Sequence, residues 1–405
     1  EPRYGFWTLP AGFMEMGDSV AEGALRETID EAGSRVDMTK VAAMGVYKPG
    51  VLVTFGEHEH ILLSFAAARG VVPTYAYNVP RKPFDDLLLD TAMRDGARYV
   101  PRAAKLKAVP GRKPDQSRVL LDEDTLALVP EWSDQPDLVI DASGRRRTFA
   151  KLFGIGSRTG QRKDVSHFAH YENCPWPEPS GTVMTIRMKY GWAWRIPLPG
   201  PKVSIGVVLN KDHAKQFGSI PEEQLENIIN SEPRIANDCA DRRRVSDVAT
   251  FANYQLISEC GSGLNWAMVG DAFGFVDPML SPGLCMAMVS AEKLADAIPK
   301  TTKGRNSLPR RLTKYWHWFA ETLAAWQNLI DYFYDGRIFA LQRTGVDMSI
   351  RYPGRFSNMM ERHITKNLSG MATGAFINRP YSRLLLSMLG RYGIRGHDPA
   401  DFAVR

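Results

Sequence analysis

Two short apolar runs in this chain each end at an acidic residue beside glycines. The run Leu138–Ile140 comes directly before Asp141, and the run Ala267–Val269 comes directly before Gly270 and Asp271. An apolar run bounded by turn residues is typical of a buried strand, and glycine lets the backbone approach a bulky ligand closely. Both patterns therefore predict strand ends that open into glycine turns, where α/β proteins bind ligands.

Helical patterns follow these turns and dominate the last quarter of the chain. Apolar residues recur at helical intervals over residues 84–97, strong helix formers fill residues 284–297, and the chain from about 300 onward is largely helical and aromatic. The first turn of a helix presents unpaired N–H groups and a partial positive charge, so the start of the 284–297 helix suits an anionic group. A tight turn that binds no ligand is the alternative.

A third predicted helix, beginning near Ser19, carries Glu27, Asp30 and Glu31. Positions i, i+3 and i+4 share one helical face, so the three carboxylates converge. Their mutual repulsion favours a cation such as Mg²⁺ between them, and a solvated acidic face is the alternative.

This segment resembles the Nudix box, the signature of hydrolases that act on nucleoside diphosphates linked to another group. The spacing of the box is intact, with aspartate in place of glutamate at two positions. The matching residues are Gly12, Asp18, Arg26, Glu27, Thr28, Asp30, Glu31 and Gly33. The resemblance implies a partial Nudix-like domain over residues 1–72, with following strands within 42–52 and 59–70, and a Mg²⁺ site at Glu27, Asp30 and Glu31.

Residues 79–89, 137–145 and 270–283 read VPRKPFDDLLL, DLVIDASGR and GDAFGFVDPMLSPG. Their order and spacing resemble three motifs shared by flavoprotein monooxygenases and flavin-dependent halogenases. The resemblance implies that Arg81 lies near FAD, that the segment from Asp141 to Gly144 supports the cofactor, and that Asp271 bonds its ribityl chain. It also implies that the turn and helix start after Asp271 bind the flavin. The cofactor-binding residues expected there are Gly270, Pro278, Ser281, Gly283 and Leu284.

A further motif, GWAWRIPLPG, contains Trp192, Trp194, Ile196 and Pro197 in the Trp-x-Trp-x-Ile-Pro pattern associated with flavin-dependent halogenases. In a strand, Trp192 and Trp194 project to the same face. They are interpreted either as an aromatic wall between substrate and cofactor or as two core tryptophans on an antiparallel strand.

The G-x-G-x-x-G element that normally opens an FAD-binding fold does not precede Arg81. In halogenases, the lysine thought to capture hypohalous acid belongs to the same N-terminal part. The sequence therefore assigns no catalytic residue, and Trp192 and Trp194 remain substrate-side candidates.

These patterns together predict a mixed α/β chain. A partial Nudix-like fragment (1–72) would precede an incomplete FAD-binding domain of glutathione-reductase type with an antiparallel substrate sheet (73–300) and a helical C-terminal region (301–405). The expected activity is that of an FAD-dependent halogenase or monooxygenase acting on a small, aromatic substrate through a flavin hydroperoxide, with a flavin reductase as partner. A Mg²⁺-dependent hydrolase of a nucleoside diphosphate derivative such as ADP-ribose, or an inactive fusion product, is the alternative.

Composition changes this interpretation little. The net charge of +6 is dispersed among acidic residues, which argues against nucleic acid as a partner. The four cysteines form no C-x-x-C pair, so a reducing cytoplasm is expected. No apolar run is long enough for a membrane span.

Overall fold

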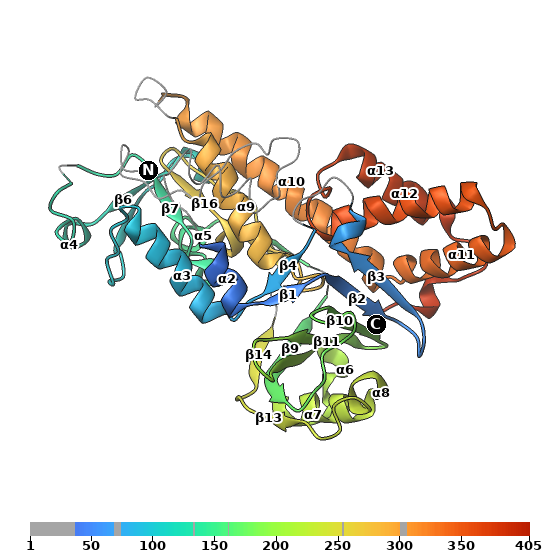
Figure 1. Cartoon of the computed structure of the whole chain (residues 1–405). Helices are drawn as coiled ribbons and strands as arrows, with labels where there is room; N and C mark the ends of the chain where they lie inside the picture. The colour runs from blue at the N-terminus through green and yellow to red at the C-terminus, as the bar shows by residue number, and fades with distance from the viewer. Residues whose placement is uncertain (1–36, 69–73, 133, 161, 253–254, 300–305) are drawn as a thin grey trace.

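The computed structural model describes residues 37–68, 74–132, 134–160, 162–252, 255–299 and 306–405 (Figure 1). The predicted helix near Ser19 and its carboxylates Glu27, Asp30 and Glu31 lie outside the described residues. Within the described ranges the chain is a mixed α/β protein, as predicted, with one large sheet, several small sheets and a helical C-terminal region.

The large sheet has eight strands in the order β13-β9-β12-β11-β10-β2-β3, with β14 also paired to β9. Its strands are β2 (Gly50–Thr54), β3 (His60–Ser64), β9 (Asp164–Glu172), β10 (Val183–Met188), β11 (Gly191–Pro197), β12 (Val203–Asn210), β13 (Arg243–Arg244) and β14 (Ala249–Ala252). All neighbours are antiparallel except β2 and β10, which are parallel. The antiparallel sheet expected within residues 73–300 is therefore present.

Strands β2 and β3 join this sheet from the segment that the sequence analysis assigned to the N-terminal unit. Val51 to Thr54 of β2 pair in register with Val183 to Ile186 of β10, and β3 pairs on the outer side of β2. Residues 50–64 therefore share one sheet with residues 164–252.

Each face of the sheet is covered by its own core. On one face, Ala193, Ile205 and Val207 pack with Leu225 and Ile228 of α7 (Pro221–Ser231). The short helices α6 (Lys211–Ala214) and α8 (Pro233–Ala236) lie on the same side in Figure 1. The other face carries Trp192 and Val208 and joins the main core of the molecule.

The predicted buried strands before the two glycine turns pair in parallel, as β7 (Val139–Asp141) with β16 (Trp266–Met268). Two antiparallel pairs of strands form further small sheets. In one, β1 (Val46–Lys48) pairs with β4 (Ala76–Asn78), and in the other, β5 (Leu106–Val109) pairs with β6 (Arg118–Leu121). A three-stranded sheet has the order β17 (Gly274–Phe275), β15 (Leu256–Ser258), β8 (Ser157–Thr159).

The helical predictions are confirmed with small changes of boundary. The helix expected over 84–97 is α3 (Arg81–Arg94), after which Gly96 takes a left-handed conformation with φ 101°. The helix expected over 284–297 is α9 (Pro282–Ala297). Shorter helices are α2 (Met38–Met44), α4 (Glu123–Leu126) and α5 (Thr148–Leu152).

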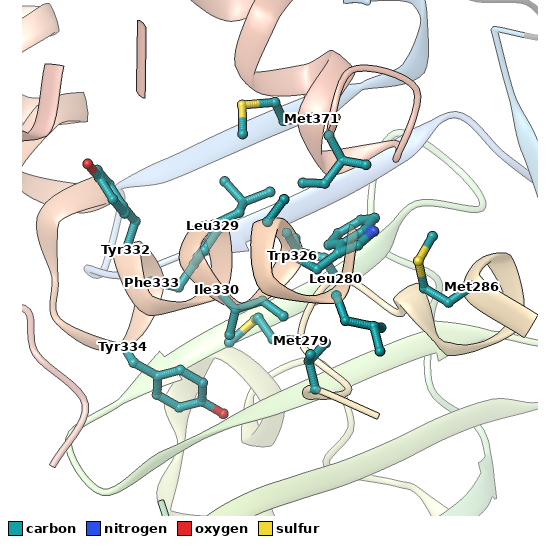
Figure 2. Close-up of a cluster of buried hydrophobic side chains, with 14 of the residues drawn as sticks. Met279, Leu280, Met286, Trp326, Leu329, Ile330, Tyr332, Phe333, Tyr334 and Met371 are labelled. Carbon is teal, nitrogen blue, oxygen red and sulfur yellow. The ribbon is translucent and has the colours of Figure 1, made fainter. Parts of the chain in front are cut away.

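The C-terminal region consists of α10 (Leu308–Tyr334), α11 (Arg337–Arg351), α12 (Arg355–Ala372) and α13 (Pro380–Met388). Figure 2 shows the core where these helices meet the turn before α9: Met279 and Leu280 lie beside Trp326 and Ile330 of α10. The aromatic run of α10 is thus core, as its helical spacing predicts.

Within the described residues, none of the helices combines the length and the apolar character that crossing a membrane requires. The same residues contain no cluster of His, Cys, Asp or Glu that could hold a metal ion.

Candidate functional site

Asp271 lies at the end of β16 in the turn that leads toward α9. Its carboxylate is half-buried, and the described residues donate no hydrogen bond to it. Burial raises the pKa of Asp271, and the positive charges of Arg145 and Arg81 partly oppose this rise. A desolvated carboxylate without protein donors is free to accept hydrogen bonds from hydroxyl groups of a ligand.

The backbone around Asp271 is held by α9. Gly270 has φ 53°, and its N–H donates to Ser290 Oγ of α9 at 2.9 Å. A Cβ at Gly270 would also lie 3.2 Å from the Cβ of Ala287. Glycine is therefore required here both by the left-handed conformation and by the close approach of α9.

The turn before α9 leaves the start of that helix open. Leu280 and Ser281 have φ values of 65° and 57°, and Ser281 makes no side-chain cap. The N–H of Ser281 donates to the carbonyl of Pro278 at 2.8 Å. The N–H groups that follow, at Gly283 and Leu284 in the first turn of this 16-residue helix, are therefore available to an anionic ligand.

Asp141 has a different role from Asp271, because its carboxylate is already used by the protein. It is buried and accepts hydrogen bonds from the N–H groups of Ser143 at 2.9 Å and Phe149 at 2.8 Å. Its carbonyl accepts from the N–H of Val269 at 3.1 Å. Asp141 therefore shapes the turn that contains Gly144, whose φ is 58°, and links that turn to the strand before Asp271.

Two arginines lie near the Asp271 carboxylate. Arg81 begins α3, is exposed, and pairs with Asp85 through bonds of 3.0 and 3.1 Å. Arg145 donates to the carbonyl of Ala252 at 3.0 Å, and its guanidinium lies 5.4 Å from the Phe251 ring centroid. The sequence analysis missed Arg145, although it stands within the DASGRRR segment.

The two tryptophans of β11 lie on one face of the sheet, as predicted from strand alternation. Their ring centroids are 5.6 Å apart. The ring centroid of Phe168 lies 5.8 Å from that of Trp194, and the ring centroid of Phe251 lies 6.1 Å from that of Phe168. These four rings form an aromatic stripe from the main core to Phe251, the ring against which Arg145 packs.

A buried chain of hydrogen bonds anchors the inner end of this stripe. The Nε1–H of Trp192 donates to the hydroxyl of Tyr334 at 2.9 Å, and that hydroxyl lies 3.1 and 3.2 Å from the two carboxylate oxygens of Asp277. Asp277 also accepts from Gln255 Nε2 and from the N–H of Met279, both at 2.8 Å. These hydrogen bonds thus connect the tryptophan motif to the turn before α9 through Tyr334 at the end of α10.

Asp277 is fully buried, and its burial raises the pKa to about 7 despite these hydrogen bonds. Because this pKa lies above the usual value of 3.8, the folded protein holds a proton that the unfolded chain releases. The stabilising contribution is therefore full below about pH 4 and is lost as the pH rises through about 7.

We expect Asp277→Asn, which is neutral at every pH, to gain stability relative to the parent as the pH rises from 5 to 8. Urea denaturation of both proteins across this range measures the difference, with Asp115→Asn as an exposed control. A difference that does not change with pH would contradict the assignment.

Lys48 is a residue that the sequence analysis did not single out. It is half-buried at the end of β1, its Nζ lies 5.9 Å from the Phe65 ring centroid, and burial lowers its pKa to about 8. Lys48 stands two residues before β2, at the end of the sheet where β11 ends. The sequence signal that could have drawn attention to Lys48 is its position directly before Pro49, Gly50 and an apolar run.

A family model described as tryptophan halogenase matches residues 66–337, more than half of the chain. The chain belongs to the tryptophan halogenase family. A second model, described as NUDIX domain, matches residues 1–80. Both predicted resemblances are therefore confirmed, and the two matches overlap over residues 66–80.

Relatives of this halogenase-family chain include a 1H-pyrrole-2-carbonyl-[peptidyl-carrier protein] brominase of Pseudoalteromonas luteoviolacea, 26% identical over 72% of this chain and 70% of the relative. A flavin-dependent halogenase of Acremonium egyptiacum is 26% identical over 67% of this chain, and a tryptophan 2-halogenase of Chondromyces crocatus is 24% identical over 64%. The chain spans 53% and 51% of the length of these two relatives. These relatives are flavin-dependent halogenases, which are enzymes, as predicted.

Solved structures with the same fold include the flavin-dependent brominase Bmp2, with a TM-score of 0.68 and 18% identity over 96% of this chain and 90% of that one. Halogenase PltM in complex with phloroglucinol and FAD has a TM-score of 0.60 and 14% identity over 93% of this chain and 80% of that one. The predicted FAD-binding type of α/β fold is thereby confirmed.

Proposed function

We propose that this chain is a flavin-dependent halogenase that holds FAD at the turn between β16 and α9 and modifies a small aromatic substrate. The observation that carries the proposal is the half-buried Asp271 carboxylate, which receives no hydrogen bond from the described residues and lies beside the open start of α9. The family match and the halogenases among the relatives support the same class of reaction.

The residues at this turn fit the polar part of a flavin cofactor. Asp271 would accept hydrogen bonds from the ribityl hydroxyls, and the N–H groups of Gly283 and Leu284 would face the electron-rich ring edge. Arg81 and Arg145 would limit the electrostatic cost of holding the Asp271 carboxylate ionised. When bound, reduced FAD would supply the activation of O₂ and the oxidising equivalent for halide.

The aromatic stripe from Trp192 to Phe251 would then separate the flavin from the substrate. Trp192 is 3% exposed and is held by the hydroxyl of Tyr334, so its ring cannot swing aside without breaking a buried hydrogen bond. Such a wall excludes water and directs the oxidised halogen along the protein interior.

Lys48 has the properties needed to receive the oxidised halogen. A pKa of about 8 leaves roughly half of the amine unprotonated at pH 8, whereas an ordinary lysine is almost fully protonated there. An unprotonated amine is a nucleophile, and its lone pair can attack the halogen of hypohalous acid with loss of water. We therefore assign to Lys48 the role of the capturing lysine, which the sequence analysis placed outside this chain.

The halogenase part would begin before residue 50, earlier than the boundary at 72. The pairing of β2 with β10 makes residues 50–64 an integral part of the substrate sheet. On this division, the Nudix-like segment ends within residues 1–45. A flavin reductase would supply reduced FAD, and the four cysteines, all free, are compatible with a reducing cytoplasm.

The direct test supplies the purified protein with FAD, a flavin reductase, NADH, O₂, bromide or chloride, and a panel of pyrroles, phenols and indoles. We expect products whose mass rises by one halogen in place of one hydrogen and only when halide is present. Hydroxylated products formed equally with and without halide would contradict a halogenase and indicate a monooxygenase.

A further inference from the structure

A pair of thiols lies on the face of the large sheet opposite the two tryptophans. Cys174 follows the end of β9, and Cys239 follows the end of α8. Both side chains are buried in the core that the sheet forms with α7. A hydrogen bond joins the two thiols, which are far apart in the sequence. Thiols in hydrogen-bond contact need only a small approach of the two sulfurs to form a covalent bond.

Arg195 holds together the two chain segments that carry these thiols. It stands on β11, its side chain is 1% exposed, and it donates to the carbonyl of Pro175 at 2.8 Å and to the carboxylate of Asp238 at 2.6 Å. Pro175 directly follows Cys174, and Asp238 directly precedes Cys239. The fold therefore keeps the two thiols side by side through contacts in which the sulfurs themselves take no part.

The pair lies beneath a thin layer of surface residues. Asn173 and Asp241 are exposed, and the side-chain amide of Asn173 donates to the carbonyl of Asp241 at 3.4 Å. Cys174 is 7% exposed, and Cys239 is fully buried. A local opening of these surface segments is enough to admit a molecule of the size of water, whereas a bulky thiol reagent needs a larger one.

The surroundings make the two thiols unequal. The hydrogen bond from Cys174 lowers the pKa of Cys239, and this effect outweighs burial, which raises it. The positive charges of Arg195 and Arg242 lower the pKa of Cys239 further. The same hydrogen bond, together with burial, raises the pKa of Cys174. Cys239 is thus the thiol with the greater thiolate character, and the thiolate is the reactive form of cysteine.

We propose that Cys174 and Cys239 form a reversible disulfide when the folded protein meets hydrogen peroxide. The sulfur of Cys239 forms a bond to one peroxide oxygen, the O–O bond breaks, and the other oxygen leaves as water, so that Cys239 becomes a sulfenic acid. The sulfur of Cys174 then displaces the remaining oxygen, which leaves as a second water with the thiol proton of Cys174. Two thiols and one peroxide thus give one disulfide and two waters, and a small dithiol reverses the reaction by exchange.

The disulfide fastens the layer of structure that backs the tryptophan strand. It closes residues 174–239 into one loop, which contains β10, β11, β12 and the helices α6, α7 and α8. A cross-link that closes a long loop restricts the unfolded chain and so stabilises the fold. The site does not depend on the proposed function, although reduced flavin and O₂ are a source of hydrogen peroxide.

The experiment maps the thiols before and after oxidation of the full, folded chain. The protein is incubated with hydrogen peroxide, treated with catalase, unfolded in iodoacetamide and digested without reduction, and mass spectrometry then identifies alkylated and linked peptides. Urea denaturation compares the stability of the reduced and oxidised forms. The test variant is Cys174→Ala. The matched control is Cys260→Ala, which removes a buried thiol outside this pair.

We expect peroxide to link the peptides of Cys174 and Cys239 in the parent and in Cys260→Ala, and to lower the equilibrium constant for unfolding by roughly 30-fold or more. Dithiothreitol should reverse both changes. In Cys174→Ala, we expect oxidation of Cys239 to its sulfenic or sulfinic acid without any gain in stability.

Alkylation of both Cys174 and Cys239 after peroxide treatment of the parent would overturn the proposal. So would a disulfide that contains Cys260 or Cys285, or a link between Cys174 and Cys239 that leaves the urea midpoint unchanged. These outcomes are all read from the parent protein, so they decide the proposal even if Cys174→Ala fails to fold.

Discussion

Replacing Asp271 with alanine is expected to weaken FAD binding by roughly 10- to 100-fold. A hydrogen bond to a charged group contributes about 1.5–3 kcal/mol, and Asp271 is the carboxylate at this turn to which none of the described residues donates. Fluorescence quenching of FAD during titration with the protein gives the dissociation constant directly. The same variant should resist denaturation at least as well as the parent without FAD, because it no longer buries a carboxylate that lacks a donor.

The matched control is Asp134→Ala, which removes an exposed carboxylate away from the turn. Its FAD affinity should equal that of the parent. An Asp271 variant that binds FAD with unchanged affinity would place the cofactor elsewhere and remove the observation on which the proposed function rests. An Asp271 variant that loses stability would instead mean that the carboxylate has a structural role.

Replacing Lys48 with methionine is expected to reduce halogenation by roughly 100-fold or more while FAD binding stays unchanged. Methionine fills a similar volume but has no amine to react. Lys48→Arg should not restore the reaction, because a guanidinium remains charged where an amine with a pKa of about 8 is partly neutral. In the parent, the rate of the chemical step should rise as the pH passes through about 8. Halogenated product, measured by mass spectrometry against flavin turnover, reports the effect.

Lys163→Met is the control for this experiment, since it removes an exposed lysine that directly precedes β9. It should halogenate at the rate of the parent. If Lys48→Met halogenates at that rate too, another group receives the oxidised halogen. If it loses FAD as well, Lys48 acts on cofactor binding and the assignment is also wrong.

The strand, turn and helix start around Asp271 could be predicted because their determinants are close in sequence. A buried strand, a glycine turn and a helix start follow one another within residues 267–284, so pattern alone indicates how they lie. The same holds for Asp141 and Gly144 after β7. The shared face of Trp192 and Trp194 also follows from strand alternation alone.

The strand pairing of the segment around Lys48 could not be predicted in this way. The sequence analysis assigned residues 42–52 and 59–70 to strands of a Nudix-like unit, and their pattern is compatible with any half-buried strand. The pairing of Val51 with Val183 depends on which edge of a distant sheet is open. Strand pairing of this kind is set by tertiary packing and is not encoded in local periodicity.

The sequence by itself therefore determined the family through its motifs. It also determined the two glycine turns, the tryptophan strand and the helical C-terminal region, since each of these depends on residues that are near neighbours in the chain. Only the tertiary structure decided that Lys48 lies just before a strand of the eight-stranded sheet and that Tyr334 connects Trp192 to Asp277. These features join residues far apart in the chain, as with Trp192 and Tyr334, and burial is what lowers the pKa of Lys48 and raises that of Asp277. Burial is a property of the packed molecule, because desolvation depends on every element that surrounds a group.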